Sequence, residues 1–499
     1  MSLTLLCTVV IFFYVVLWFF DSFFKSCMHY PYYAFLEGTG IKVGMFYMSV
    51  TTTALNGLIY RTTKRYWAPV GQGWYSIGQM AICFVFLPVC IMLLLLIIYN
   101  ELIDPVSITY GPELQAVIPG VNVPSADFIE YFLSLAISTI VHEYGHAVIA
   151  SLEGVRLLSV GMCVVAIVPI AFVELNGEHI RHLCEKHKLR IYCAGIWHNL
   201  FTAGVAFALY YLTPLLFSFG YTIGGGVRIV DIAPNSILAD PVRGMEVGDI
   251  LLSINGCGSY KMREFNNCLK STYSRQGLCL SQDYIMENDE MVTELFIQDD
   301  VMECCSQEQG QNNICFEYIE PNTSHVNNLS TQYSCLKPRE VVKEAFAFCS
   351  KENEYTCPKH SHCLRPSLPN NTYFMAVHRL NRDPVLYLGS PQDFLSLKVD
   401  EYFPRNRIFA GFTPVSFEKF MRYLVLFSMG IAFVNTLPCY GTDGHHIMRI
   451  MFEWAAVKFH LGNKFVQWGS FISVLLGTTL TLPLVSSAIW GPPSSGLDP

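Results

Sequence analysis

The chain is poor in charge for its length. Only 14% of its 499 residues are Asp, Glu, Lys or Arg, and 52% are hydrophobic, whereas about a quarter of a soluble domain is usually charged. The net charge is −8, and neither a basic helix nor zinc-finger spacing occurs, which argues against a nucleic-acid partner. This composition excludes an ordinary soluble domain. It predicts an α-helical polytopic membrane protein whose surroundings are a lipid bilayer.

Six stretches are apolar over the length of about 20 residues that a helix needs to cross a bilayer. They run over residues 3–20, 75–99, 126–151, 191–217, 417–437 and 468–490. The first has no basic segment before it and no small-residue cleavage site after it, so we expect an uncleaved anchor. The second contains Pro88, which leaves open either one kinked helix or a tight hairpin.

A further apolar stretch, residues 155–173, is short and is interrupted by Gly161 and Pro169. Irregular backbone at membrane depth is tolerated only where it is buried in protein or lines a wet cavity. A re-entrant segment and a plain transmembrane hairpin both remain open here. A re-entrant segment would be able to hold an extended peptide by edge pairing.

No C-x-x-C pair occurs in residues 218–419, the one large region between the expected spans, although the chain has 18 cysteines. This absence argues against a structural zinc ribbon. Sequons for N-glycosylation begin at Asn322, Asn328 and Asn370 in the same region. Cysteine-rich sequence with sequons is typical of an oxidising lumen, so we expect disulfides, with the pairing left open. The cysteines concerned are Cys257, Cys268, Cys279, Cys304, Cys305, Cys315, Cys335, Cys349, Cys357 and Cys363.

The distribution of charge predicts an orientation. Residues 101–127 carry four acids and no Lys or Arg, whereas basic residues gather in 25–65 and in 156–190. Because Lys and Arg are enriched in cytosolic loops, the two basic segments are expected on the cytosolic side. The cysteine-rich region and the N-terminus are then luminal. The chain is expected in a membrane of the secretory pathway.

Three ionisable residues, His142, Glu143 and His146, lie within five positions of the third apolar stretch. Histidines four apart lie on one face of a helix, where both imidazoles can bind one zinc ion. Glu143 is placed to take a proton from a water molecule at such an ion. Ionisable residues inside a membrane segment are costly, which favours a functional site over a chance pair of histidines. The orientation puts this site toward the cytosolic side.

A catalytic zinc ion usually has three protein ligands. The best candidate for the third is Asp443, in the segment 435–444 where asparagine, proline and glycine interrupt the fifth stretch. A broken helix exposes backbone groups, and a carboxylate beside them can reach a metal in a wet pocket. His445 and His446 are rival ligands.

The motif His-Glu-x-x-His, together with a distant Asn-x-x-Pro-x-x-x-x-Asp-Gly, resembles the site-2 protease family of intramembrane zinc metalloproteases. The resemblance covers about residues 128–201 and 417–452. It implies one catalytic zinc ion bound by His142, His146 and Asp443, with Glu143 as the catalytic base. Thr442 stands where many members have leucine.

Asn199 and Asn435 resemble the asparagines of the same family that lie near the metal. The resemblance implies that they bind the substrate backbone or the developing oxyanion. The alternative is that both serve only as interhelical hydrogen bonds.

Residues 226–256 resemble part of a PDZ domain, with strands over 227–232 and 250–254 and an Asn-Gly turn after them. The pattern is then lost and resumes near 384–394. The expected organisation is an N-terminal membrane anchor region (1–125), a membrane core with the zinc motif and re-entrant segment (126–217), and a luminal β-rich PDZ-like domain (218–415). The last is interrupted by a cysteine-rich insertion (257–373), and a C-terminal membrane core (416–499) supplies the third ligand.

A PDZ-like domain interrupted by a glycosylated, cysteine-rich insert indicates the animal form of the family. The resemblance then implies a Golgi membrane enzyme that cuts single-span substrates already cleaved once in the lumen. These would be membrane-bound transcription factor precursors, namely sterol regulatory element-binding proteins and a factor of the unfolded protein response. The alternatives are a polytopic metal-ion transporter and a catalytically inactive membrane scaffold.

Overall fold

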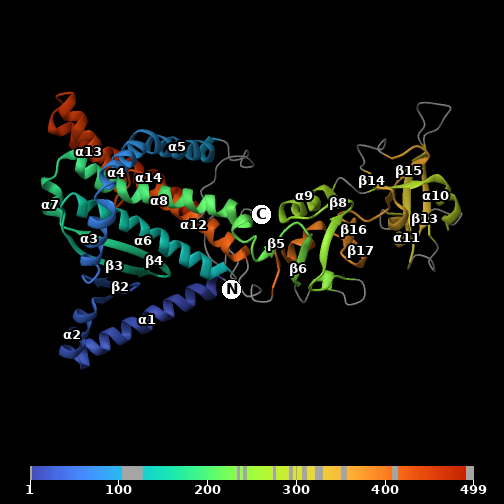
Figure 1. The fold of residues 1–499 in the computed structure, drawn as a ribbon, viewed down its shortest axis with the longest axis horizontal. Helices are drawn as coiled ribbons and strands as arrows, with labels where there is room; N and C mark the ends of the chain where they lie inside the picture. Colours follow the sequence, from blue (N-terminus) through green and yellow to red (C-terminus); the bar gives the residue numbers. More distant parts are fainter. Residues whose placement is uncertain are drawn as a thin grey trace. The chain divides into compact units, whose positions relative to one another are not determined.

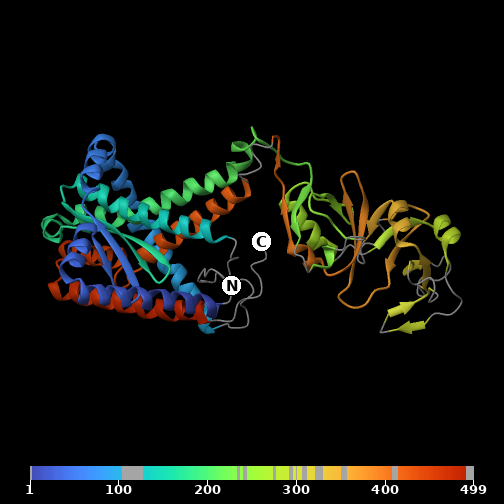
Figure 2. The same cartoon turned by 90° about the horizontal axis from the view of Figure 1, so that it is seen from below.

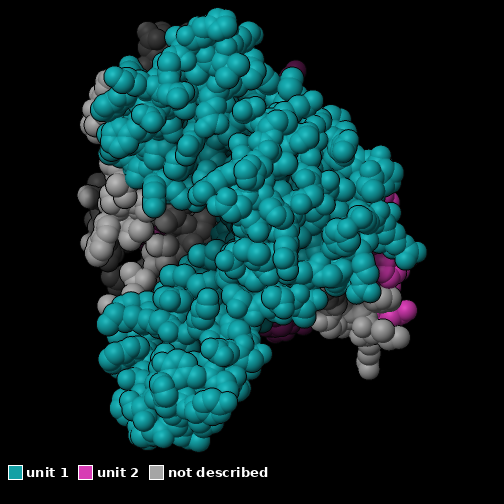
Figure 3. Space-filling view, turned by 90° about the vertical axis from the view of Figure 1, so that its left-hand side faces the viewer, with its two compact units in different colours: residues 1–213, 416–499 teal, residues 214–415 magenta. Residues whose placement is uncertain are grey.

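The structure is a computed structural model. It describes residues 3–103, 127–232, 236–239, 244–273, 277–290, 296–298, 301–305, 312–320, 330–349, 357–406 and 414–490. The predicted glycosylation sites at Asn322 and Asn328 lie outside these residues. The chain divides into two compact units, residues 1–213 with 416–499, and residues 214–415. Figure 1 follows the chain through both, and Figure 3 colours the first unit teal and the second magenta.

The first unit is mainly helical. Its helices are α1 (Leu3–Cys27), α2 (His29–Thr39), α3 (Asn56–Thr62), α4 (Gly71–Ala81), α5 (Leu87–Ile103), α6 (Phe128–Leu152), α7 (Gly177–His182), α8 (Glu185–Leu216), α12 (Pro414–Thr436), α13 (Asp443–Lys458) and α14 (Asn463–Trp490), with the π-helical turns η1 (Thr63–Trp67) and η2 (Ile82–Phe86). The α6 and α12 helices run side by side (Figures 1 and 2), joined by a cluster that includes Tyr131, Leu135 and Phe427.

Four helical segments among the described residues are long and apolar enough to cross a bilayer. They are Thr8–Cys27, Gly71–Tyr99, Phe128–Leu152 and Glu185–Leu216. The α12 and α14 helices, where the other two spans were expected, form but do not belong to this set. In α12 the acidic and basic residues Glu418, Lys419 and Arg422 lie near its start, which lowers its mean hydropathy.

The stretch containing Pro88 forms one helix rather than a hairpin. The segments α4, η2 and α5 follow one another without a break, and Gly71–Tyr99 counts as a single span. Pro88 has no N–H and therefore cannot donate the usual hydrogen bond to the residue four positions earlier. The wider π-helical turn η2 directly precedes it, which is the usual local adjustment at such a position.

The first unit also contains a four-stranded antiparallel sheet of order β1-β2-β3-β4. Its strands are β1 (Ile41–Val43), β2 (Tyr47–Thr52), β3 (Leu157–Val165) and β4 (Val168–Leu175). The interrupted apolar segment 155–173 thus forms the hairpin β3–β4, whose turn contains Ala166 at a φ of 54°. The basic segment 25–65, for which no strand was predicted, supplies β1 and β2. The outermost strand β4 packs along α6 (Figure 1).

The second unit contains a sheet of order β17-β16-β7-β6-β18, with β8 paired to β7. Its strands are β6 (Val227–Ile232), β7 (Ile250–Ile254), β8 (Cys257–Gly258), β16 (Tyr373–Arg379), β17 (Arg382–Gly389) and β18 (Leu397–Asp400). The helix α9 (Met262–Thr272) buries Phe265, Cys268 and Leu269, at helical spacing, in the core of this sheet. The residues just after 257, predicted as the start of the insertion, therefore pack with the first sheet. The likeness to a PDZ domain remains a prediction.

A second sheet of order β13-β12-β15-β9-β14 follows within the same unit. Its strands are β9 (Gly277–Ser281), β12 (Ile314–Glu320), β13 (Ser330–Leu336), β14 (Ala347–Cys349) and β15 (Ser361–Pro366). Smaller elements of the unit are β5 (Tyr221–Thr222), β10 (Phe296–Gln298), β11 (Val301–Glu303), β19 (Phe403–Pro404), α10 (Gln282–Asn288), α11 (Pro338–Glu344), η4 (Ile237–Ala239) and η6 (Pro391–Ser396).

The expected disulfides are confirmed. All ten cysteines of the region are paired: Cys257–Cys268, Cys279–Cys357, Cys304–Cys315, Cys305–Cys335 and Cys349–Cys363. The free cysteines among the described side chains all lie in the first unit. Asn370, the remaining sequon, is exposed in a turn just before β16, where Asn371 adopts a φ of 64°.

Candidate metal centre

The two histidines of the motif and Asp443 lie together. His142 and His146 are on successive turns of α6 and are buried, and Asp443 is the first residue of α13. The Asp443 Oδ2 atom is 3.1 Å from His142 Nε2 and 3.2 Å from His146 Nε2. The two Nε2 atoms are 3.2 Å apart. Three lone-pair donors therefore converge on one point.

This triangle matches what zinc requires. Tetrahedral ligands at about 2.0–2.1 Å from the metal lie about 3.3 Å from one another, close to the 3.1–3.2 Å between these atoms. Two imidazoles and one carboxylate are a usual ligand set of catalytic zinc sites, with a fourth position left for water. The residues present fit a zinc ion.

The segment between α12 and α13 turns sharply to bring Asp443 to the histidines. The Thr442 hydroxyl donates to the carbonyl oxygen of Leu437 at 2.7 Å, which closes the loop. A Cβ at Gly444 would lie 2.3 Å from that same oxygen, so only glycine allows the chain to return this closely. In the sequence, Gly444 stands out only as part of the Asp-Gly motif, which gives no sign of this packing role.

Glycines on α6 and α8 allow the two helices to meet at the site. A Cβ at Gly145 would lie 2.7 Å from the carbonyl oxygen of Ala194. A Cβ at Gly195 would lie 2.4 Å from His146 Nε2 and 2.7 Å from His142 Nε2. The absence of a side chain at Gly195 therefore leaves the space beside the ligand atoms open. Gly195 was not among the predicted site residues, although a glycine inside an apolar helix is a signal of close packing.

The opposite ring nitrogens of both histidines contact α8. His146 Nδ1 lies 2.8 Å from the carbonyl oxygen of Ile191. His142 Nδ1 lies 3.2 Å from the side-chain amide of Asn199, which is fully buried. Partners of this kind orient metal-binding histidines and fix which nitrogen carries the proton.

Glu143, the predicted base, is adjacent to the first histidine and points toward the sheet. Its Oε2 atom accepts a hydrogen bond from the backbone N–H of Val173 in β4, at 3.0 Å. The carboxylate is thus held between the motif helix and the outermost strand. Sequence analysis did not predict this contact, because it depends on where β4 passes.

The rival residues lie apart from the three converging atoms. His446 stacks on Tyr192 with ring centroids 4.4 Å apart, and His445 stacks on His446. Asn435 is partly buried in the last turn of α12. In the described part of the chain, no hydrogen bond connects it to the histidines or to Asp443.

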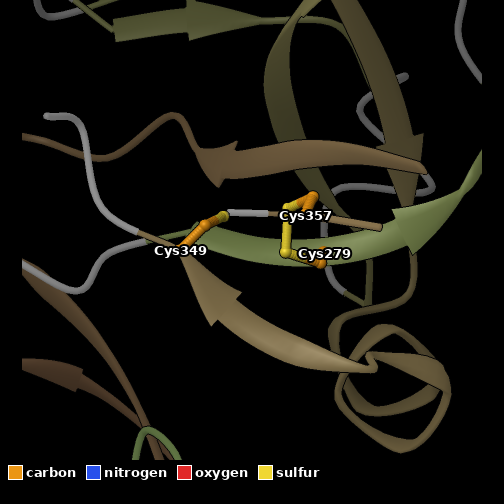
Figure 4. Close-up of side chains that lie close together, drawn as sticks. All are labelled: Cys279, Cys349 and Cys357. Carbon is orange, nitrogen blue, oxygen red and sulfur yellow. A yellow bond between two sulfur atoms is a disulfide. The ribbon is translucent and has the colours of Figure 1, made fainter. Parts of the chain in front are cut away.

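A second gathering of possible metal ligands is of a different kind. Cys279, Cys349 and Cys357 lie close together in the second unit (Figure 4). Cys279 is bonded to Cys357, and Cys349 is bonded to Cys363. Cysteine binds metals as the free thiolate, so these sulfur atoms are structural.

Comparison with known proteins agrees with this geometry. The model of peptidase family M50 matches residues 130–372, a region that includes His142, Glu143, His146 and Asn199. This M50 region ends before Asp443, so the third member of the triangle comes from sequence outside the match.

Two relatives show the extent of the similarity. The chain is 30% identical over 223 residues to a membrane-bound transcription factor site-2 protease homolog of Arabidopsis thaliana, covering 44% of this chain and 41% of the relative. It is 27% identical over 204 residues to an uncharacterised protein of Methanocaldococcus jannaschii, covering 40% of this chain and 50% of that protein. The chain thus spans half or less of each of these relatives.

Proposed function

We propose that the chain is an intramembrane zinc metalloprotease that hydrolyses a peptide bond within the transmembrane helix of its substrate. The observation that carries this proposal is that Asp443 meets His142 and His146 at one point. The two histidines and Glu143 lie on α6, a helix apolar enough to cross a bilayer. The match of residues 130–372 to the model of peptidase family M50 supports the reaction type.

In this reaction, the zinc ligands, Glu143 and the backbone of Val173 have different roles. Zinc, when bound by the three ligands, acts as a Lewis acid that polarises the scissile carbonyl and lowers the pKa of an attacking water. Glu143 takes a proton from that water and passes it to the leaving amine. The Val173 N–H keeps the Glu143 carboxylate oriented toward the sheet edge, where we place the substrate backbone.

The substrate is proposed to bind as an added strand along β4. Among the described strands of this sheet, β4 is one of the two edge strands, with β3 as its one strand partner. Its Val173 N–H donates to Glu143 on α6, so this edge faces the motif helix. Backbone pairing requires the substrate helix to unwind first, because helical hydrogen bonds occupy its carbonyl groups. Helix-breaking residues in the substrate therefore favour cleavage.

The proposed substrates are single-span membrane proteins already cut once in the lumen. The name of the Arabidopsis relative, a membrane-bound transcription factor site-2 protease homolog, supports transcription factor precursors as the class. By resemblance we propose sterol regulatory element-binding proteins and a factor of the unfolded protein response, in the Golgi membrane. The second unit would lie in the lumen, which its paired cysteines support.

The test is cleavage of a pre-trimmed single-span substrate by the purified chain in liposomes. We expect cleavage within the membrane helix, lost on zinc chelation and lost in Glu143→Gln without loss of bound zinc. Glu130→Gln, on the first turn of the same helix, is the matched control and should cleave normally. Cleavage that persists in Glu143→Gln contradicts the mechanism. An inactive wild type with zinc bound would favour a metal-ion transporter or an inactive scaffold.

A further inference from the structure

The side chain of Asn199 is enclosed beside the metal centre. It has no exposed surface, and its Nδ2 atom as placed lies 3.2 Å from His142 Nδ1. Its Oδ1 atom has no hydrogen-bond partner among the described residues. The amide therefore makes one contact with the protein through one end, and that contact is with a proposed zinc ligand.

The chemistry of the histidine decides which end of the amide faces it. If an amide N–H donated to His142 Nδ1, the ring proton would sit on Nε2, the atom that points at Asp443 Oδ2. A protonated Nε2 has no lone pair for a metal. Turning the amide by a half-rotation exchanges its oxygen and nitrogen at nearly the same positions. Nδ1–H then donates to Oδ1, and Nε2 is free to bind.

The neighbouring ligand shows the same arrangement without this choice. His146 Nδ1 faces the carbonyl oxygen of Ile191, which can only accept, so its proton sits on Nδ1. Asn199 is two turns further along α8 than Ile191. The helix thus presents one oxygen acceptor to each histidine, from the backbone in one case and from a side chain in the other.

We propose that Asn199 is a positioning residue that holds His142 in its Nδ1–H tautomer through its side-chain oxygen, rather than a donor to the substrate carbonyl. The inference rests on the proposed zinc site. It predicts that Asn199 acts on metal affinity, which is measurable without any substrate.

The experiment measures zinc affinity by chelator competition on the purified full-length chain. Asn199→Leu removes the acceptor at similar volume and should weaken binding about 10- to 100-fold, the usual effect of losing such a partner. Asn199→Asp keeps an acceptor oxygen and should bind zinc at least as tightly as wild type. The control is Thr213→Val, a buried change on the same helix at a hydroxyl that donates to the carbonyl oxygen of Leu209; it should leave affinity unchanged.

The aspartate variant separates the two roles. If Asn199 instead donates to the substrate carbonyl, Asn199→Asp and Asn199→Leu should lose cleavage equally and both keep their zinc affinity. That result overturns the inference. Equal loss of zinc in both variants overturns it as well. Equal melting temperatures of the metal-free wild type and Asn199→Leu would show that the weaker zinc binding is not caused by unfolding. A lower melting temperature of Asn199→Leu would count against the inference.

Failure of the proposed function has a different appearance. A wild type that binds no stoichiometric zinc, or that keeps it in His142→Ala, removes the metal site itself and the inference with it. A wild type that binds zinc through His142 but cleaves nothing leaves the positioning role standing while the protease proposal falls.

Discussion

At the scale of single residues, the candidate metal centre depends on glycines without a side chain as much as on the side chains of its ligands. The spacing of His142 and His146 was sufficient to predict that they share a helix face, and the broken helix around Asp443 predicted the third group. Neither could reveal Gly195, because its role depends on how closely α8 approaches α6. Backbone partners such as the Ile191 carbonyl and the Val173 N–H have no sequence signal of their own.

Gly195→Ala tests the space beside the ligands. The added methyl would lie 2.4 Å from His146 Nε2 and 2.7 Å from His142 Nε2, so it competes with the metal and displaces both rings. We expect loss of bound zinc, measured as zinc per chain by mass spectrometry, together with loss of cleavage. Gly204→Ala on the same helix meets nothing within 4 Å and should retain zinc. Full zinc occupancy in Gly195→Ala would contradict the assigned position of the site.

Arg190→Leu tests a buried ion pair at the end of the motif helix. Arg190 Nη1 lies 2.7 Å from Glu153 Oε1, and both side chains are nearly inaccessible. Removing the arginine leaves a buried carboxylate beside the imidazole of His187, whose Nδ1 atom lies 3.4 Å from Glu153 Oε2. We expect a loss of about 3 kcal/mol in the free energy of unfolding, at the lower end for broken buried pairs because His187 compensates in part.

The matched control for this pair is exposed. Arg181 and Glu178 form an ion pair at 3.1 Å with side chains 78% and 71% exposed. Arg181→Leu should change the unfolding free energy by less than about 0.5 kcal/mol. Denaturant unfolding in detergent measures both variants, and equal effects would show that burial of the Arg190 pair contributes nothing.

At the scale of elements, the order of apolar stretches predicted most of the helices, and the pairing of strands was harder to foresee. Pro88 allowed two interpretations from sequence, and the structure has the single helix with a π-helical turn before it. The hairpin β3–β4 lies where the sequence left a re-entrant segment and a transmembrane hairpin both open. The strands β1 and β2 were missed, because three and six residues give too little alternation to separate a strand from a loop.

Tyr14→Phe tests how α1 supports the β3–β4 hairpin, the proposed binding site of the substrate. The buried Tyr14 hydroxyl donates to the carbonyl oxygens of Val164, near the end of β3, and Ala166, in the β3–β4 turn, at 3.1 and 3.0 Å. Losing a hydrogen bond worth about 0.5–1.5 kcal/mol should lower kcat/KM about 2- to 10-fold and leave bound zinc unchanged. Hydrogen exchange should become faster at residues 163–168.

The control for this change is Tyr30→Phe, at an exposed position of α2. It should alter neither exchange in the hairpin nor cleavage. If Tyr14→Phe slows cleavage without faster exchange at the turn, the hydroxyl acts in some way other than by holding the hairpin.

At the scale of the whole molecule, cysteine chemistry separates the two units. The ten cysteines of the second unit are all bonded in pairs, and the free thiols among the described residues belong to the first. Sequence predicted the existence of these bonds from density and sequons. It could not predict the pairing, because ten cysteines permit many connectivities and the choice depends on which strands become neighbours.

The bond Cys279–Cys357 should stabilise the second unit more than Cys257–Cys268. The bond Cys279–Cys357 joins residues 78 apart in the sequence, and Cys257–Cys268 joins residues 11 apart. The chain entropy that each bond removes from the unfolded state corresponds to a stabilisation of about 4.5 kcal/mol for the first and about 2.8 kcal/mol for the second. Each bond is removed by replacing both of its cysteines with alanine in the full-length chain. Limited proteolysis should then cut the second unit much faster in the variant without Cys279–Cys357 than in the variant without Cys257–Cys268. Bound zinc should stay unchanged in both variants. Equal proteolysis would contradict the loop-length argument.

The proposed metal ligands are far apart in the sequence, so the ribosome synthesises them at different times. Asp443 follows His146 by about 300 residues, and the whole second unit is encoded between them. At about 5–20 residues per second, a ribosome needs roughly 15 to 60 s to travel that distance. Throughout this interval the motif helix already exists without its carboxylate partner. A nascent or prematurely terminated chain therefore lacks the third proposed zinc ligand, and with it the complete site that the proposed protease activity requires.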